Sequence, residues 1–481
     1  GLGEYALATS QVHLSEGFGQ QAAVNTNSPL GLSDFSVSMD ALQGELPACQ
    51  SVMLTVSWFG DDLRCASCQI APKVKQNTAD AEAMPWRVSG QTRTGTGRVP
   101  LVSDDPVFDG TPTDAAVVEA IVDMRARGLS AAFYPAITMS QVAGNTRPNP
   151  LTGTVGQPAF PWRGNITTSL APGLAGSPDG TAAAAAELAV FMGQASAGDF
   201  TVSGTLVDYT GPVDWGYRRF ILHYAHLCAL AGGVDAFCIG SEMRSLTQIR
   251  GADSSFPAVA ELRKLAADVR SILGVGTKIG YGADWSEYFG YHPQDGSGDV
   301  YFHLDPLWSD SDIDFVGIDN YMSLSDWRDG PEHADAGWRS IYDVGYLRSN
   351  VAGGEGYDWY YADQAGREAQ ERLPIDDGAY GEPWVFRYKD ILNWWRTLHH
   401  YRIGGVRLAE STGWVPESKP IWFTEIGCAA IDKGTNQPNK FIDPKSSESS
   451  LPHYSAGTRE DQIQSQYLRA IHLHWADADN N

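Results

Sequence analysis

Strand-length apolar runs alternate with helix-patterned segments along much of this chain, and that alternation limits the choice of fold. The strand-like runs are 51–59, 129–137, 235–240, 277–283, 314–319 and 420–425. The clearest helical segments are 113–128, 215–231, 257–274, 388–401 and 459–475. Strands that are joined by helices cross over in one direction and form a parallel sheet. The sequence therefore predicts an α/β fold.

Two long stretches interrupt this alternation. One begins at residue 139 and is rich in Gly, Pro, Asn and Thr, and the other, 322–383, is rich in Asp, Gly, Tyr and Trp. Each follows a strand, so in a parallel barrel both would lie at the carboxyl ends of the strands, where active sites form. Because barrels run long as single domains, we predict one domain, 1–481, with insertions at about 139–213 and 322–383.

Charge and hydropathy exclude several classes of partner. The formal net charge of -24 over 481 residues opposes binding to nucleic acid or to an anionic membrane surface. No window approaches the apolar length of a membrane span, and the opening GLGEYALATS lacks the features of a signal peptide. Since the chain starts without Met, it reads as a fragment of a longer protein.

Cysteine and histidine spacing predicts neither a metal nor a cofactor. The six cysteines include one close pair, Cys65 and Cys68, but no second C-x-x-C accompanies it. We expect structural thiols or one local disulfide there, in preference to zinc. The pairs His399-His400 and His472-x-His474 lie in predicted helices, where such spacing points the rings apart. No G-x-S-x-G elbow or Walker loop is present.

Acidic residues stand at the ends of three predicted strands. Alternation gives the inward sets Cys238, Gly240 and Glu242; Phe315, Gly317, Asp319 and Tyr321; and Ile421, Phe423 and Glu425. A carboxylate in a barrel mouth costs free energy unless it is paired or hydrogen-bonded. The plain structural alternative is that Glu242 and Glu425 pair with Arg244 or Lys419. Two carboxylates across a cleft otherwise suit glycoside hydrolysis, which makes Glu242 and Glu425 the candidate catalytic residues.

Aromatic and polar residues near the strand ends fit a carbohydrate cleft. Aromatic faces stack on sugar rings, and carboxylates accept hydrogen bonds from sugar hydroxyls. The predicted substrate-binding residues are Trp58, Ser241, Asp284, Trp285, Asp319, Asn320 and Tyr321. Further aromatic candidates in the second long loop are Trp327, Trp338, Trp359 and Tyr360.

The strings FCIGSE and WFTEIG resemble the ends of the fourth and seventh strands in the retaining glycosidase clan built on eight-stranded barrels. That resemblance implies a TIM (β/α)8-type barrel with Glu242 as acid/base and Glu425 as nucleophile. Tyr321 matches a tyrosine that supports the nucleophile in such enzymes. The implied activity is that of a retaining glycoside hydrolase without a cofactor.

Longer strings carry a closer resemblance. They are SWFGDDLRCASC (57–68), FPWRGNIT (160–167), IGSEMRSLT (239–247) and AAIDKGTNQPNKFIDPKSSES (429–449). These are similar to the TIM-barrel-like domain of the tail hub protein of gene transfer agents and related phage-like particles. The resemblance implies a tail-tip component that is assembled in the bacterial cytoplasm and acts outside the cell. Its implied partners are other tail proteins and a bacterial surface or cell-wall glycan.

Three departures from the glycosidase pattern support a second hypothesis. Ser241 stands where the clan has Asn, and a serine hydroxyl reaches less far toward a sugar. The arginine near the nucleophile is not evident in LTVSWFGDD, unless Arg64 loops back. The first strand would have to be YALATSQV, 5–12, and an eighth would lie beyond Asn481. The alternative is therefore a catalytically inactive structural or glycan-binding module.

Overall fold

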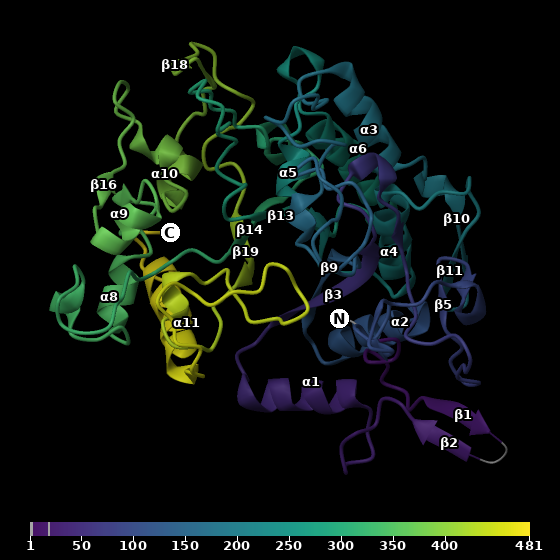
Figure 1. Ribbon diagram of the computed structural model, residues 1–481. Helices are drawn as coiled ribbons and strands as arrows, with labels where there is room; N and C mark the ends of the chain where they lie inside the picture. The colour runs from purple at the N-terminus through teal and green to yellow at the C-terminus, as the bar shows by residue number, and fades with distance from the viewer. Residues whose placement is uncertain (1–2, 18–19) are drawn as a thin grey trace. The chain divides into compact units, whose positions relative to one another are not determined.

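The computed structural model describes residues 3–17 and 20–481 (Figure 1). Residues 1–2 and 18–19 of the predicted domain lie outside this part. The chain forms two compact units. The first unit comprises 1–281 with 310–315, and the second unit comprises 282–309 with 316–481.

A mixed sheet forms the centre of the first unit. β3 (Ser51–Gly60) and β9 (Ser130–Met139) pair in parallel along their whole length. β12 (Ala236–Ser241) continues the parallel order beside β9, and β13 (Lys278–Asp284) follows it. The short β4 (Ile70–Ala71) lies antiparallel on the other side of β3. Four of the six predicted strands are confirmed here.

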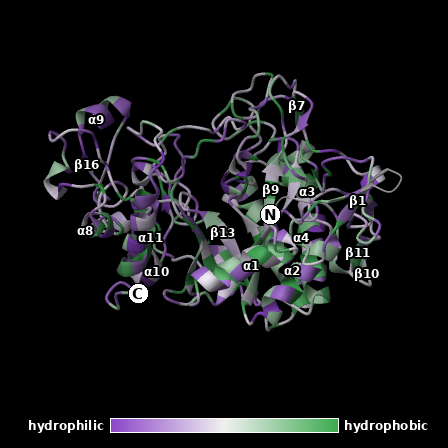
Figure 2. Cartoon of the chain, turned by 90° about the horizontal axis from the view of Figure 1, so that it is seen from below, coloured by the Kyte–Doolittle hydropathy of each residue, from purple (hydrophilic) through white to green (hydrophobic). Residues whose placement is uncertain are grey.

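Helices connect the parallel strands, as the alternation predicted. α2 (Asp114–Ala126), α4 (Tyr217–Leu230) and α6 (Pro257–Leu273) separate successive strands of this sheet. Figure 2 shows hydrophobic residues concentrated on β9, α2 and α4. α6 begins with Pro257, where the missing N–H costs no hydrogen bond, and ends before Gly274.

The N-terminal segment differs from its prediction. Residues 5–12 form a turn and a bend, not the expected first strand, and a hairpin of β1 (His13–Gly17) and β2 (Gln20–Ala23) follows. The reason lies in side-chain anchoring: buried Arg93 donates to Glu4 at 2.8 Å and to the Tyr5 hydroxyl at 2.9 Å. These bonds hold the backbone in turns without a sheet ladder.

The first unit also holds short elements outside the sheet. They are α1 (Asp34–Glu45), α3 (Ala182–Met192), α5 (Arg244–Thr247) and the hairpins Arg87–Val88 with Gln91–Thr92, Leu101–Val102 with Asp105–Pro106, and Phe200–Ser203 with Leu206–Tyr209. Cys65 and Cys68 are buried free thiols, and burial raises the pKa of each to about 12. The expectation of structural thiols therefore holds, and the disulfide alternative does not.

In the second unit, β14 (Phe315–Asn320) and β19 (Ile421–Ile426) pair in parallel, which confirms the remaining two strands. α11 (Asp461–Trp475) packs on α8 (Val344–Ser349) around a core that includes Leu347 and Tyr467. The hydroxyl of Tyr467 also donates to the Met322 carbonyl at 3.0 Å. The second long insertion therefore packs against the C-terminal helix α11.

Shorter elements complete the second unit. They are α7 (Asp305–Trp308), α9 (Gln364–Ala369), α10 (Ile391–Arg396), β15 (Trp359–Tyr360) with β16 (Leu373–Pro374), and β17 (Arg402–Ile403) with β18 (Val406–Arg407).

The predicted helix 388–401 is wrong beyond α10. The chain leaves helical geometry at Thr397, and the buried His399 ring lies 2.9 Å from the Asp305 carboxylate. That side-chain pair competes with continued helix formation. Among the described residues, no helix is both long and apolar enough to cross a membrane.

Candidate active site

Glu242 directly follows β12 and has a strained backbone. Its φ is +48°, in the left-handed region that non-glycine residues seldom adopt, and its side chain is 6% exposed. The turn is braced on both sides. The Tyr217 hydroxyl donates to the Ile239 carbonyl at 2.8 Å, and Met243 N–H donates to the Tyr281 hydroxyl at 2.9 Å. The first unit therefore fixes where the Glu242 carboxylate points.

Two neighbours in sequence, Trp162 and Arg163, hold that carboxylate. Trp162 Nε1 donates to Glu242 Oε2 at 2.7 Å, and Arg163 Nη2 lies 2.9 Å from the same oxygen. Arg163 also donates to the Ser241 carbonyl at 3.1 Å and to its hydroxyl at 3.0 Å. The strings 160–167 and 239–247 thus meet in one cluster.

The sequence interpretation missed Trp162 and Arg163. It offered Arg244 and Lys419 as structural partners, and it did not include Arg163 of the first long insertion, which pairs with Glu242. Gly164 is the one residue of that string that hints at a close approach of the Trp162 ring. A Cβ at this position would lie 2.4 Å from the Trp162 ring, so only glycine lets the indole fold back over the turn. Such a close approach cannot be read from spacing alone.

Glu425 lies at the end of β19 in the second unit, past an irregularity in the strand. The register pairs Ile318 with Phe423 and then Asp319 with Glu425, so Thr424 is an extra residue that forms a bulge. Phe423 packs on Trp475 of α11 with ring centroids 5.8 Å apart. The prediction that Phe423 and Glu425 share an inward face is therefore wrong, because the bulge breaks the alternation.

The hydroxyl of Tyr321 donates to Glu425 Oε2 at 2.7 Å. Tyr321 follows β14, the strand that pairs with β19, so adjacent strand ends supply both groups. The contact expected from the glycosidase resemblance is thus present, and its catalytic role stays a prediction. Tyr321 also borders a pocket of about 150 Å³ with Trp285, Tyr388 and residues of the string 429–449.

The other predicted substrate-binding residues of the second unit have local partners. Buried Asp319 accepts from the Thr424 hydroxyl at 2.6 Å, and Asn320 Oδ1 accepts from Met322 N–H at 3.2 Å. Asp284 accepts from Ser286 N–H at 2.9 Å. These bonds shape the strand ends. Half-buried Trp285 lines the pocket beside Tyr321, and for it a sugar contact stays a prediction.

The prediction that Trp58 binds substrate is wrong. Its side chain has no exposed surface, and its Nε1 donates to the Tyr224 hydroxyl at 3.0 Å. The ring also packs on Phe220, with centroids 5.2 Å apart. Both partners lie on α4, so residue 58 faces the helix layer of the first unit and belongs to its core. A contact between Trp58 and substrate is therefore ruled out in this structure.

Parallel strands, crossover helices and carboxylates at the strand ends together define a TIM-barrel-like α/β domain. The family model described as the GTA TIM-barrel-like domain matches residues 215–481, more than half of the chain and a range that includes Glu242 and Glu425. The chain belongs to this family. No curated protein matches it.

Two solved structures illustrate the similarity in chain path. A GH113 β-1,4-mannanase is 13% identical, with 92% of this chain and 79% of that chain covered and a TM-score of 0.42. The GH113 β-mannanase AaManA from Alicyclobacillus acidocaldarius, in complex with ManMIm, is 14% identical, with coverages of 91% and 75% and a TM-score of 0.36. Likeness at this level does not identify a substrate.

Proposed function

We propose that this domain is a retaining glycoside hydrolase of a phage-like tail tip, of the gene transfer agent type, and that it cleaves a bacterial surface or cell-wall glycan. The observation that carries the proposal is the 2.7 Å hydrogen bond from Tyr321 to Glu425. It orients a carboxylate at a strand end, as a nucleophile requires. Membership of the GTA TIM-barrel-like family supports the setting in a tail, with other tail proteins as partners.

In the proposed reaction, Glu425 attacks the anomeric carbon while Glu242 gives a proton to the departing glycosidic oxygen. The glycosidic bond breaks and a glycosyl ester forms on Glu425. Glu242 then takes a proton from water, which attacks the same carbon and releases Glu425. Tyr321 keeps one Glu425 oxygen engaged, so that the other is directed at the sugar. Retention would require the two carboxyl groups to lie about 5 to 5.5 Å apart.

A second candidate is a binding module without hydrolysis, and the Arg163 cluster favours it. Arg163 and Trp162 both bind Glu242 Oε2, and Arg163 also donates a hydrogen bond to the Ser241 hydroxyl. To act as an acid, Glu242 would have to carry a proton beside the Arg163 guanidinium, which favours the charged carboxylate. In the binding-module candidate these contacts persist, and the cluster only shapes the turn after β12.

Product release separates the two candidates. Purified sacculi and capsular polysaccharide are incubated with the wild type, with Glu425→Ala and with the surface control Glu371→Ala, and soluble fragments are measured by mass spectrometry. The hydrolase proposal predicts fragments from the wild type and the control only. If folded wild type releases nothing while it still binds the insoluble glycan, the binding module is the correct function.

A further inference from the structure

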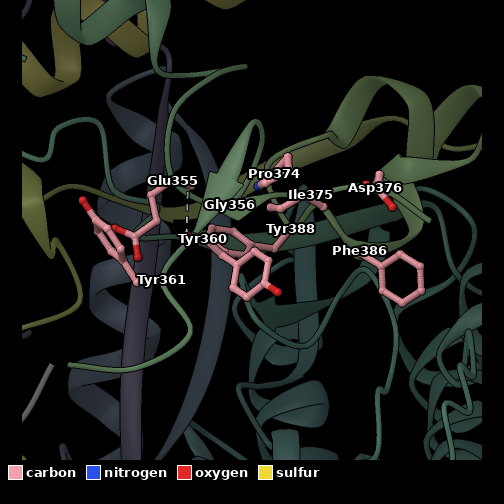
Figure 3. A pocket seen from close by; sticks show the side chains of 9 residues that line it. All are labelled: Glu355, Gly356, Tyr360, Tyr361, Pro374, Ile375, Asp376, Phe386 and Tyr388. Atoms are coloured by element: carbon pink, nitrogen blue, oxygen red, sulfur yellow. Dashed lines mark hydrogen bonds between the residues drawn. The ribbon is translucent and has the colours of Figure 1, made fainter. Parts of the chain in front are cut away.

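A hollow in the second unit lies within the long insertion and the segment after it. Its volume is about 550 Å³, within the range of ligand sites. Figure 3 shows its lining: Glu355, Gly356, Tyr360, Tyr361, Pro374, Ile375, Asp376, Phe386 and Tyr388. Glu355 and Tyr361 lie at one end and Phe386 at the other, with Tyr360 and Tyr388 between them. We call this the insertion pocket.

Tyr388 is fixed in position by close packing. Gly356 has a φ of +82°, and a Cβ there would lie 2.0 Å from Cζ of Tyr388. The buried Tyr288 hydroxyl donates to the Tyr388 carbonyl at 2.7 Å. The Trp285 ring also contacts Tyr388, with centroids 4.8 Å apart. A ring held in this way is already placed for stacking before any ligand binds.

The end of the insertion pocket near Glu355 is held by ion pairs. Arg367 Nη1 donates to Glu355 Oε2 at 3.0 Å, and its guanidinium lies over the Tyr361 ring at 4.7 Å. The Tyr361 hydroxyl donates to Asp326 at 2.6 Å, and Arg372 donates to the same carboxylate oxygen at 2.9 Å. Binding would therefore cost little ordering of these side chains.

Three lining residues remain open to solvent. Tyr360 is 46% exposed, and Pro374 and Asp376 are exposed as well. The charged residues of the lining are both acidic, Glu355 and Asp376, and Glu355 is paired with Arg367. Aromatic faces stack on the apolar face of a pyranose, and carboxylates accept hydrogen bonds from its hydroxyls. An anionic sugar would be repelled by Asp376.

The insertion pocket adjoins the pocket that contains Tyr321. Glu355 and Tyr388 line both, and the smaller pocket contains the tyrosine that binds Glu425. We propose that the insertion pocket is a sugar-binding subsite for neutral or amino sugars, and that one glycan chain runs through both pockets. The direction of that chain toward Glu425 rests on the proposed function, whereas sugar binding in the insertion pocket does not.

The test measures binding of three hexasaccharides to the full chain by isothermal titration calorimetry. The probes are chitohexaose (neutral), the glucosamine hexamer (cationic) and the galacturonate hexamer (anionic). We expect the first two to bind and the third to bind at least 10-fold more weakly. Tyr360→Ala should weaken binding of the neutral and cationic probes about 10-fold. Asp376→Asn should reduce the preference for the cationic over the neutral probe about threefold.

Matched controls are Tyr380→Ala, which removes a tyrosine that is 40% exposed outside the lining, and Glu371→Gln. Neither should alter affinity. The subsite is overturned if neither the neutral nor the cationic probe binds, if the anionic probe binds most tightly, or if Tyr360→Ala has no greater effect than Tyr380→Ala. Probe binding without fragment release from any glycan contradicts the hydrolase proposal and leaves the subsite intact.

Discussion

The two candidate carboxylates are held in opposite ways within their own units. Glu242 in the first unit is 6% exposed, has a left-handed backbone conformation and is bound by a guanidinium and an indole. Glu425 in the second unit is half-buried and accepts from the neutral phenol of Tyr321. A cation favours the charged form of its neighbour, whereas a phenol orients it without adding charge. Glu242 therefore depends on its ion pair more than Glu425 depends on its tyrosine.

The largest effect is expected on the reaction itself. Glu425→Gln should lower the hydrolysis rate on the order of 10⁴-fold, because it removes the nucleophile. Glu242→Gln should cost much less on an aryl glycoside whose leaving group needs no proton, and as much on a natural glycan. Rates are compared on both substrates, with circular dichroism as the fold control. Equal losses on the aryl glycoside would show that the two glutamates do not have distinct roles.

The next largest effect is expected on stability. Arg163→Ala removes a guanidinium from a buried carboxylate, and should lower the free energy of unfolding by about 3 kcal/mol. The measurement is urea unfolding followed by tryptophan fluorescence. The double variant Arg163→Ala, Glu242→Gln serves as the control and should recover part of the loss. If the single variant unfolds like the wild type, the ion pair does not stabilise the turn.

Tyr321→Phe should have a smaller effect, since it removes one neutral hydrogen bond to a half-buried group. We expect about 1 kcal/mol in the free energy of unfolding and a roughly 10-fold lower hydrolysis rate. The same unfolding assay compares it directly with Arg163→Ala. A loss of stability as large as that of Arg163→Ala would contradict the difference drawn between the two carboxylates.

A separate effect, on the pH dependence of stability, concerns a second buried cation. Lys389 in the second unit donates to the carbonyls of Asn350 and Gly353 at 3.0 and 3.1 Å, and burial lowers its pKa to about 7. The unfolded chain holds that proton up to about pH 10, so between pH 7 and 10 the unfolded state binds more protons. Stability contributed by Lys389 therefore rises with pH across this window.

Lys389→Met provides the comparison that isolates this residue, because contributions from other titrating groups cancel. The free energy of unfolding of the wild type should increase relative to that of Lys389→Met from pH 7 to 9, by at most about 1.4 kcal/mol per pH unit. Urea unfolding at each pH measures the difference. A difference that stays constant with pH would mean that Lys389 remains charged in the folded protein.

Periodicity predicted the regular part of the fold well. All six apolar runs form strands, and α4 and α6 lie where their three-four spacing placed them, because burial of one face dictates both patterns. Predictions failed where single side chains decide the backbone. Arg93 anchors residues 4–5 in turns, and the buried pair of His399 with Asp305 replaces the end of a predicted helix.

The candidate site was predictable only in part. Alternation and strand ends identified Glu242, Glu425 and Tyr321, but the bulge at Thr424 separates Phe423 from Glu425, which alternation had assigned to one face. Trp58 was misassigned because a strand-end tryptophan in sequence can face either layer. Arg163 and Trp162 were missed since they lie some 80 residues from Glu242, and no local pattern reports such a contact. Long-range contacts of this kind need the structure.

The most direct test of the two-glutamate account is the separation of the carboxyl carbons of Glu242 and Glu425 in a crystal structure of the protein. The account predicts about 5 to 5.5 Å, the separation of a retaining pair, with both groups facing one solvent-filled cleft. A separation above about 10 Å, or carboxylates that face different cavities, would contradict it and leave the glycan-binding module as the function of the domain.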